Sequence, residues 1–457
     1  MALHIPAIIN KRSILVFAGV TGLIVSFLAL RVISSEFNYD IHWNERPTIM
    51  AVSLTIIAAI SYFTILFSLA KAHIKPNQSI QASTLFDKPQ NLSSPDFFSY
   101  PGSFSYKGFL ILGLLIRIIW FGSTPIFEDD YYRYFFDGQM VTNGLNPYAY
   151  APADALPSIL PTVIETPPHK FNANTNNGAN YDTGNNNDKT IATETITTPD
   201  KPFAQGLIIN TQKTSTDPDI PINLKAIAKG GPVDRVAYPY IRTIYPPVTQ
   251  GFFAFSQWIA PWSLDTWRGI LLLVELICLT LLHWLLKMLQ KPSWQLMIYW
   301  LNPLVIAETM NAGHMDILLL PFLLASVLFY MYRRSGTAGA MLAFAVGVKL
   351  WPLVLSPFLF KKQIRKFWNI KALFVTLIPF TTLTLVLLAP QIVTKLDGDA
   401  GLVAYSENWQ VNAFLFSIID ILMLSIIENS VYASRLIIAI LLLAIGGYNL
   451  AKDLKIP

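Results

Sequence analysis

The sequence predicts an all-α, polytopic transmembrane helix bundle, and three observations lead to this fold class. Hydrophobic residues make up 53% of the 457 residues and charged residues only 13%, and the mean hydropathy is +0.45. A soluble chain carries about 25% charged residues, so the surroundings of this chain are mostly lipid. Apolar runs recur that are long enough to cross a bilayer, and they predict about 9–11 spans in one domain, residues 1–457, with a long outer loop after the third span.

The spans are predicted from apolar runs of about 20 residues, because each helical residue adds about 1.5 Å. Lys11 and Arg12 precede the first run, which is too long for a signal-peptide core, so we expect a retained span. Two weaker segments are 246–262 and the pair 337–349 with 351–360, which Pro352 would break. The clear candidates are 14–34, 48–70, 108–125, 268–288, 294–310, 315–332, 371–391, 411–428 and 432–451.

Positive charge predicts the orientation of these spans. Lys11 and Arg12 favour a cytoplasmic N-terminus, and the lysines of loop 71–107 mark that loop as cytoplasmic. The stretch 127–245 then faces outward. Within it, residues 165–232 are rich in Asn, Thr, Gly and Pro, and they cannot bury enough apolar surface to offset their ordering entropy. We therefore expect a disordered low-complexity insertion there.

Several classes of site are disfavoured by the residue types present. The single cysteine, Cys278, excludes an internal disulfide and a cysteine-based metal site. The six histidines are scattered, and no His-x-x-x-His pair lies on one expected helix. No nucleic-acid motif is present. We expect no obligatory metal, although a divalent ion held by Asp129 and Asp130 remains an alternative.

The outer loop opens with the acidic and aromatic segment 127–138. Asp129 and Asp130 stand where an interfacial helix begins, and Asp130, Arg133 and Asp137 would share one face of that helix. One interpretation is a reactive acidic pair at the membrane surface. The other is helix capping by Asp129 or Asp130, because Asp is a preferred N-cap residue.

Further polar residues lie at the ends of predicted spans. Tyr245 precedes two prolines, and Glu407 and Asn408 precede another span. His314 and Asp316 could bind an acceptor or orient a base, or they could equally form a polar plug.

Two cations lie inside apolar segments, where a charge costs several kcal/mol unless it is paired or solvated. Lys349 is therefore a functional candidate, and snorkelling to the interface is the alternative. For Arg117, in the third span, we expect an acidic partner on a neighbouring helix.

Six short segments, taken in order, resemble a known family. The chain is similar to the GT-C type polytopic glycosyltransferases, and to the bacterial branch of mannosyltransferases that use polyprenyl-phosphate sugars. The resemblance covers most of residues 108–428 apart from the insertion. The segments are EDDYYRYFFDG, GLNPYAYAP, IYPPVTQ, NAGHMD, GVKLWP and SENWQVN.

This resemblance implies an inverting transfer of a hexose, with mannose favoured, from a polyprenyl-phosphate donor to a glycan or lipid acceptor. It implies a multi-pass protein of the inner (plasma) membrane with an extracytoplasmic site, in contact with the lipid bilayer and not with nucleic acid. Asp130 would be the general base, with Asp129 as the alternative or as an orienting partner. Substrate contacts would come from Arg133, Asp137, Arg242, Tyr245, His314, Asp316, Lys349, Glu407 and Asn408, with the cations on the phosphate.

Two other functions compete with this interpretation. A transporter predicts charged groups near the middle of the membrane and a helix pattern repeated between the halves, and no convincing repeat is present. A polymerase or ligase for lipid-linked glycans predicts an arginine-rich outer loop. The clustering of acids at the outer end of the third span favours the transferase.

Overall fold

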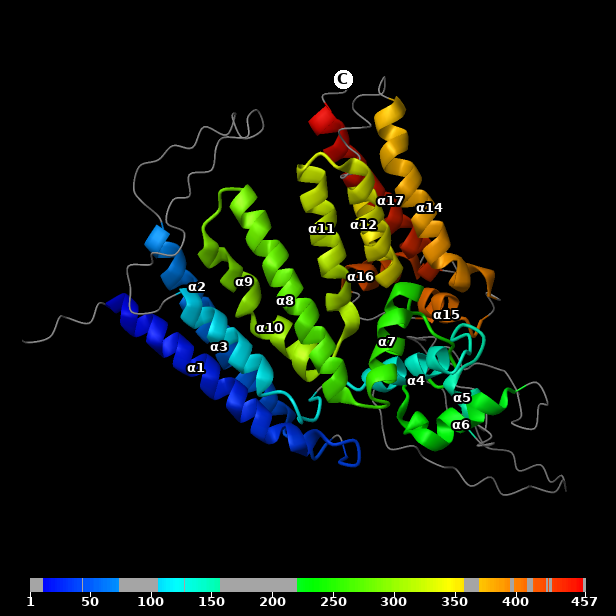
Figure 1. Ribbon diagram of the computed structural model, residues 1–457, viewed down its shortest axis with the longest axis horizontal. Helices are drawn as coiled ribbons and strands as arrows, with labels where there is room; N and C mark the ends of the chain where they lie inside the picture. The colour runs from blue at the N-terminus through cyan, green and yellow to red at the C-terminus, as the bar shows by residue number, and fades with distance from the viewer. Residues whose placement is uncertain are drawn as a thin grey trace, which may run out of the picture.

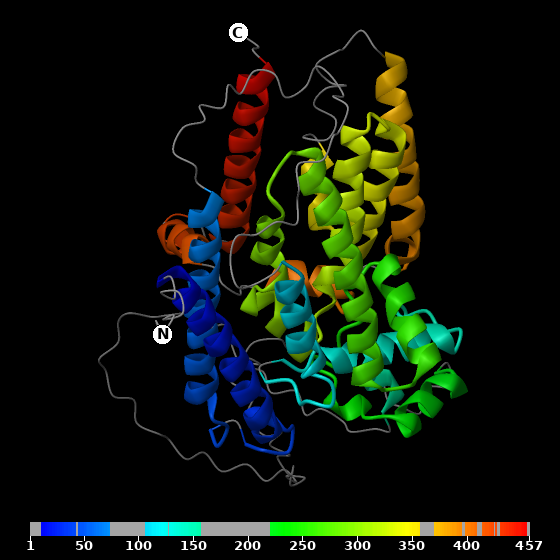
Figure 2. The same ribbon diagram turned by 60° about the vertical axis from the view of Figure 1, so that its left-hand side comes forward.

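The computed structural model describes residues 11–42, 44–73, 106–126, 128–156, 220–356, 370–394, 398–408, 414–424, 426 and 430–454. Every regular element in these ranges is a helix, which confirms the predicted all-α polytopic bundle. The long helices run alongside one another, and a group of short helices lies across one end of them (Figure 1). Figure 2 shows the same crosswise arrangement of α4 after a 60° rotation.

The N-terminal part of the bundle packs three helices against the middle of the chain. A buried apolar cluster joins α1, α2 and α3 to the segment 296–310. Gly19 allows the close approach of α1 to α2, because a β-carbon there would lie 2.8 Å from Ile65 Cγ1. The elements are α1 (Lys11–Ile33), η1 (Ser34–Phe37), α2 (Thr48–His73) and α3 (Tyr106–Ile118).

The middle of the chain contains a sharply bent helix pair. Pro303–Asn311 and Met315–Met331 meet at 103°, and η4 is a π-helical turn. The elements here are α8 (Leu264–Met288), η3 (Ser293–Leu296), α9 (Met297–Trp300), α10 (Pro303–Ile306), η4 (Ala307–Asn311), η5 (Met315–Leu318) and α11 (Leu319–Met331).

The prediction of one continuous span over 294–310 was wrong, because the helix stops and restarts within this range. The Oδ1 atom of Asn302 accepts a hydrogen bond of 3.0 Å from the amide of Leu304, which caps α10. Pro303 occupies the first position of that helix, where its missing N–H is tolerated. Asn302 and Pro303 therefore begin a new helix rather than continue α9.

The C-terminal part of the bundle contains the predicted break near Pro352. α12 ends at Val348 and a 3-10 helix begins at Trp351, so the expected interruption of 337–360 is confirmed. α12 packs against α11 and α14, and α16 packs against α17. The elements are α12 (Ser335–Val348), η6 (Trp351–Leu355), α14 (Ile370–Val393), α15 (Gly401–Asn408), α16 (Phe414–Leu424) and α17 (Ser430–Leu454).

The short helices at one end form a lobe with its own apolar core. Leu224 and Ile227 of α6 are buried against Phe136 and Met140 of α4. The segment 220–232 is therefore folded, which corrects the C-terminal boundary of the predicted insertion; its other residues, 165–219, lie outside the described ranges. The elements are α4 (Tyr131–Thr142), α5 (Pro152–Ala155), α6 (Ile222–Gly230), η2 (Val233–Arg235) and α7 (Pro247–Ile259).

A buried polar cluster ties the helices together inside the bundle. Arg117 of α3 pairs with Glu275 of α8, and Glu275 also accepts a hydrogen bond from Thr309. The guanidinium of Arg117 lies 3.8 Å from the ring centroid of Trp300. The expected acidic partner for Arg117 on a neighbouring helix is thus confirmed.

Among the described residues, four helices are long and apolar enough to cross a membrane, or up to five if the bent pair is one span. The four are Ser13–Phe37, Thr48–Lys71, Leu264–Met288 and Phe374–Val393, and each overlaps a predicted span. α3 and α16, predicted as full spans over 108–125 and 411–428, have only 13 and 11 residues as described. The count of about 9–11 spans, derived from apolar run lengths, stays a prediction.

Candidate active site

Three side chains of the type that moves protons or binds cations meet at the end of the bundle that carries α4. Carboxylate oxygens of Glu128 and Asp130 and a ring nitrogen of His314 all lie within 4.8 Å of one another. Glu128 and Asp130 belong to the loop before α4, whereas His314 belongs to the bend between η4 and η5. Segments that lie far apart in the sequence therefore form one cluster.

The bend at residues 312–314 directs His314 toward this loop. Gly313 has a φ of +74°, a left-handed conformation that side chains disfavour. The amide of His314 donates a hydrogen bond of 2.9 Å to the carbonyl of Glu308, and its Nδ1 lies 2.5 Å from the Glu308 carboxylate. Glu308 thus orients the imidazole, and its carboxylate joins the cluster.

The charges of the cluster shift one another's protonation. Burial and the neighbouring carboxylate of Asp130 raise the pKa of Glu128, although His314 opposes this shift. Burial alone would lower the pKa of His314, but the hydrogen bond to Glu308 and the nearby carboxylates raise it above its usual value. The nearby carboxylates thus favour the protonated form of the imidazole, because opposite charges stabilise each other.

The structure tests the alternative that Asp130 is only a helix cap. Asp130 stands at the N-cap position of α4, yet its backbone is helical and its side chain makes no capping hydrogen bond. An N-cap residue normally has an extended backbone and accepts from the helix amides with its side chain. Capping therefore does not explain Asp130, which is partly exposed in the cluster.

A cation is paired with a carboxylate on the segment that follows His314. The ammonium of Lys349 is paired with the carboxylate of Asp316, and both side chains are about half exposed, at 44% and 52%. An ion pair this exposed contributes little to stability. Lys349 lies at the C-terminal end of α12, at the predicted break. Its exposure leaves the ammonium accessible to an anionic ligand.

Arg133 and Asp137, expected to bind substrate, face the interior instead. Their side chains form an ion pair of 3.1 Å, and Asp137 also accepts a hydrogen bond of 3.1 Å from Gln250 Nε2 of α7. Arg133 Nη2 donates 2.6 Å to the carbonyl of Ile241. Burial raises the pKa of Asp137, while Arg133 opposes that shift. This geometry favours a role in joining α4 to α7, and substrate contact by these two residues stays a prediction.

Tyr245 and Arg242 lie on the chain that leads into α7. The ring of Tyr245 packs edge-on against Tyr134 with centroids 5.2 Å apart. Burial and the carboxylate of Asp130 raise its pKa, so its hydroxyl lies within electrostatic reach of the cluster. Arg242 lines a small depression with Tyr148 and Gln391, and its amide donates 2.9 Å to the carbonyl of Asp399. Arg242 is thus described beside residues 399–402 rather than beside Glu128.

Two other expected substrate contacts are placed only by their backbone. Glu407 and Asn408 end α15, and their side chains lie outside the described part of the chain. Asp129 precedes Asp130, and its carbonyl accepts 3.2 Å from the amide of Tyr132, which begins the turn into α4.

Glu128 and Glu308 were not among the site residues expected from the sequence. Glu128 lies in the acidic segment 127–138 and Glu308 lies six residues before His314, but nothing in the spacing shows that these two parts of the chain meet. Glu128, Asp130 and His314 are oxygen and nitrogen donors of the kind that bind divalent ions, and they are the residues that could hold one. The expected ion-binding pair was Asp129 with Asp130.

The fold is that of a polytopic membrane protein. One end of it carries the carboxylate and imidazole cluster of Glu128, Asp130 and His314, and the cation Lys349 is paired with Asp316. Residues 243–450 match Glycosyltransferase family 87, and this match supports a membrane glycosyltransferase. The matched range is a little under half of the chain, and it includes His314 and Lys349 but not Asp130. No curated protein and no solved structure matches the chain.

Proposed function

We propose that this chain transfers a hexose, with mannose favoured, from a polyprenyl-phosphate donor to a glycan or lipid acceptor. The transfer inverts the anomeric centre and takes place at the extracytoplasmic face of the inner (plasma) membrane. The observation that carries the proposal is the meeting of Glu128, Asp130 and His314 within 4.8 Å at the end of a helix bundle. The match to Glycosyltransferase family 87 over residues 243–450 supports the reaction class.

Asp130 acts as the general base in this proposal. Its carboxylate takes the proton of the acceptor hydroxyl while that oxygen attacks the anomeric carbon. The bond from the anomeric carbon to the phosphate oxygen breaks in the same step, and its electron pair leaves with the polyprenyl phosphate. Asp129 supports the base as its neighbour. Asp130 is suited to this role because it is partly exposed and its carboxylate lies in the cluster with Glu128 and His314.

The leaving phosphate needs positive charge, and two groups near the cluster supply it. Lys349 is half exposed, and a phosphate dianion would compete with Asp316 for its ammonium. The raised pKa of His314 favours its protonated form, which carries one positive charge. The guanidinium of Arg133 is already engaged by Asp137 and Ile241, so it is the weaker candidate.

The imidazole of His314 also bears on the question of a metal. When it is protonated, His314 offers one positive charge to Glu308, its partner at 2.5 Å, and to Glu128 and Asp130, whose carboxylate oxygens lie within 4.8 Å. We therefore propose that transfer needs no obligatory metal. Treatment with EDTA followed by gel filtration is expected to change the rate less than twofold, and restoration of a lost rate by Mg²⁺ or Mn²⁺ would overturn this point.

The central test replaces the base. Asp130→Asn is expected to lower the rate of transfer at least about a thousandfold, because the amide has no basic oxygen of comparable strength. Membranes that contain the protein, together with the host's glycan and lipid acceptors, are incubated with labelled polyprenyl-phosphate mannose, glucose and arabinose, and the labelled product is identified. Asp40→Asn is the matched control, because the Asp40 side chain is 71% exposed and its ion pair with Arg235 is long, at 3.7 Å.

The outcomes of this test separate the parts of the proposal. Loss of transfer in Asp130→Asn with normal abundance and a normal control supports the base. Full activity of Asp130→Asn would assign the proton transfer to another group. Transfer from glucose or arabinose alone would correct the sugar, and no transfer from any of the three donors by the wild-type chain would refute the donor class.

A further inference from the structure

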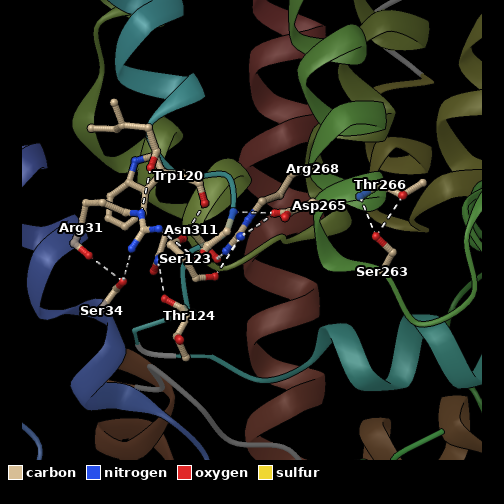
Figure 3. Close-up of polar contacts among 12 residues, drawn as sticks. Arg31, Ser34, Trp120, Ser123, Thr124, Ser263, Asp265, Thr266, Arg268 and Asn311 are labelled. Carbon is tan, nitrogen blue, oxygen red and sulfur yellow. Dashed lines mark hydrogen bonds and ion pairs between the residues drawn. The ribbon is translucent and has the colours of Figure 1, made fainter.

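We propose that Asn311 and Arg268 are positioning residues that fix the spacing between the loop of Asp130 and the bend of His314. This inference rests on the proposed function, since it concerns the same acid–base centre. Neither residue touches the cluster itself. They act through the backbone of residues 122–126 on one side and 311–313 on the other, and both sides are held by side chains at the start of α8 (Figure 3).

Asn311 joins the two segments directly. Its Oδ1 accepts a hydrogen bond of 2.9 Å from the amide of Ile126, and its Nδ2 donates one of 3.1 Å to the carbonyl of Thr124. The side chain is buried, with 3% exposure, so water offers little competition for these bonds. Ile126 precedes Glu128 by two residues, and His314 follows Asn311 by three. A shift of Asn311 therefore changes the positions of both Glu128 and His314.

Arg268 provides a second link between the same segments. Its Nη1 donates 2.9 Å to the carbonyl of Ser123, and its Nη2 donates 3.0 Å to the carbonyl of Asn311. Asp265 lies 3.2 Å from the same guanidinium and accepts 2.8 Å from the amide of Gly122. The planar fork of arginine sets the directions of these donors, which the rotatable ammonium of a lysine would not reproduce.

Trp267, which precedes Arg268 on α8, contacts the bend itself. Trp267 Nε1 donates 2.7 Å to the carbonyl of Gly313, next to His314. A β-carbon on Gly313 would lie 3.4 Å from Trp267 Cδ1, so the indole packs closely against this turn. The first turn of α8 thus contacts both the loop and the bend, and it supplies a common reference for Asp130 and His314.

The need for such a reference follows from the chemistry. A misplacement of about 1 Å between reacting groups can lower a rate about a hundredfold. Beyond Phe121, the backbone hydrogen bonds described within the loop 119–130 are those of turns, such as the bond of 3.1 Å from the amide of Ser123 to the carbonyl of Trp120. The side chains of Asp265, Arg268 and Asn311 replace that missing support.

The experiment compares Asn311→Ala with Ser326→Ala. Ser326 is also buried and donates 2.7 Å to the carbonyl of Ala338, but its bond joins α11 to α12 away from the cluster. Transfer is measured as kcat and donor KM across pH. The position of the His314 signal is measured separately by NMR of histidines labelled at Cε1, with His314→Gln to assign it. Should Asn311→Ala fold poorly, Arg268→Lys takes its place.

We expect kcat to fall about tenfold to a hundredfold in Asn311→Ala with donor KM changed less than threefold. The Cε1 signal of His314 moves, because Asn311 no longer holds the bend at its distance from the loop of Asp130. Ser326→Ala changes neither kcat nor this signal. An unchanged His314 signal together with an unchanged kcat per folded molecule would overturn the positioning role. The NMR readout needs no substrate, so a wrong donor class would leave this test intact.

Discussion

Two sets of charges include residues of the segment 128–137 around α4, and their surroundings differ. The pair of Arg133 and Asp137 is buried, and each group has its partners inside the protein. The cluster of Glu128, Asp130 and His314 is partly exposed, and its carboxylates outnumber its one imidazole. A matched, buried pair holds helices together, whereas an unmatched, accessible cluster has charge available for a substrate.

The largest expected effect is a loss of stability when the buried pair of Arg133 and Asp137 is broken. Asp137→Asn leaves the charge of Arg133 buried without its counterion, so the free energy of unfolding is expected to fall by about 3–5 kcal/mol. Thermal unfolding in detergent and the yield of folded protein measure this loss. The double variant with Arg133→Met should regain part of it, because no lone charge remains buried.

The same variant decides between scaffold and substrate contact. Activity per folded molecule of Asp137→Asn should stay within about threefold of the wild type if Asp137 only joins α4 to α7. A loss of activity that exceeds the loss of folded protein would restore the original prediction that Asp137 contacts substrate.

A smaller expected effect removes the imidazole from the accessible cluster. His314→Gln keeps a hydrogen-bonding side chain beside Glu308 but carries no proton charge, so kcat is expected to fall about a hundredfold. The melting temperature should change little, because the cluster is partly exposed. His283→Gln on α8 is the matched control. Equal activity of the two variants would remove His314 from the proposed mechanism.

The smallest expected effect is a shift of the pH profile. Nearby carboxylates raise the pKa of His314. On the alkaline side of the pH profile, activity should therefore begin to fall at a pH above the usual histidine pKa of about 6.5. Glu128→Gln removes one of these carboxylates and should move the alkaline limb to lower pH. The stabilisation from this interaction is present below the unfolded-state pKa and is lost as pH rises through the higher folded-state value. A limb that moves to higher pH would contradict the assigned cause.

The class of fold and the principal segments of the site could be predicted from the sequence. Long apolar runs are a property of the local chain, and α1, α2, α8 and α14 appear where those runs lie. The acidic partner of Arg117 could also be expected, because a lone charge among apolar helices is costly. Both features could be predicted because each follows from the cost of placing a residue in apolar surroundings.

The inward turn of Arg133 could not be predicted in the same way. Spacing placed Asp130, Arg133 and Asp137 on one helix face, but it does not say which neighbour covers that face. In the structure α7 covers it, and Gln250 completes the pairing. Asp130 lies one residue before α4 and escapes this burial.

The acid–histidine cluster depends on long-range contacts that no local pattern contains. Glu308 lies on a π-helical turn, and the bend after it requires the left-handed conformation of Gly313. The polar segment 308–316 was visible in the sequence, but its approach to Glu128 depends on Arg268 and Asn311.

The 103° corner between Pro303–Asn311 and Met315–Met331 has a consequence for redesign of the molecule. Each residue added to a helix turns everything beyond it by about 100°, so an insertion within 303–318 would swing the imidazole away from its partners. Redesign of the chain should therefore keep the number of residues in 303–318 unchanged.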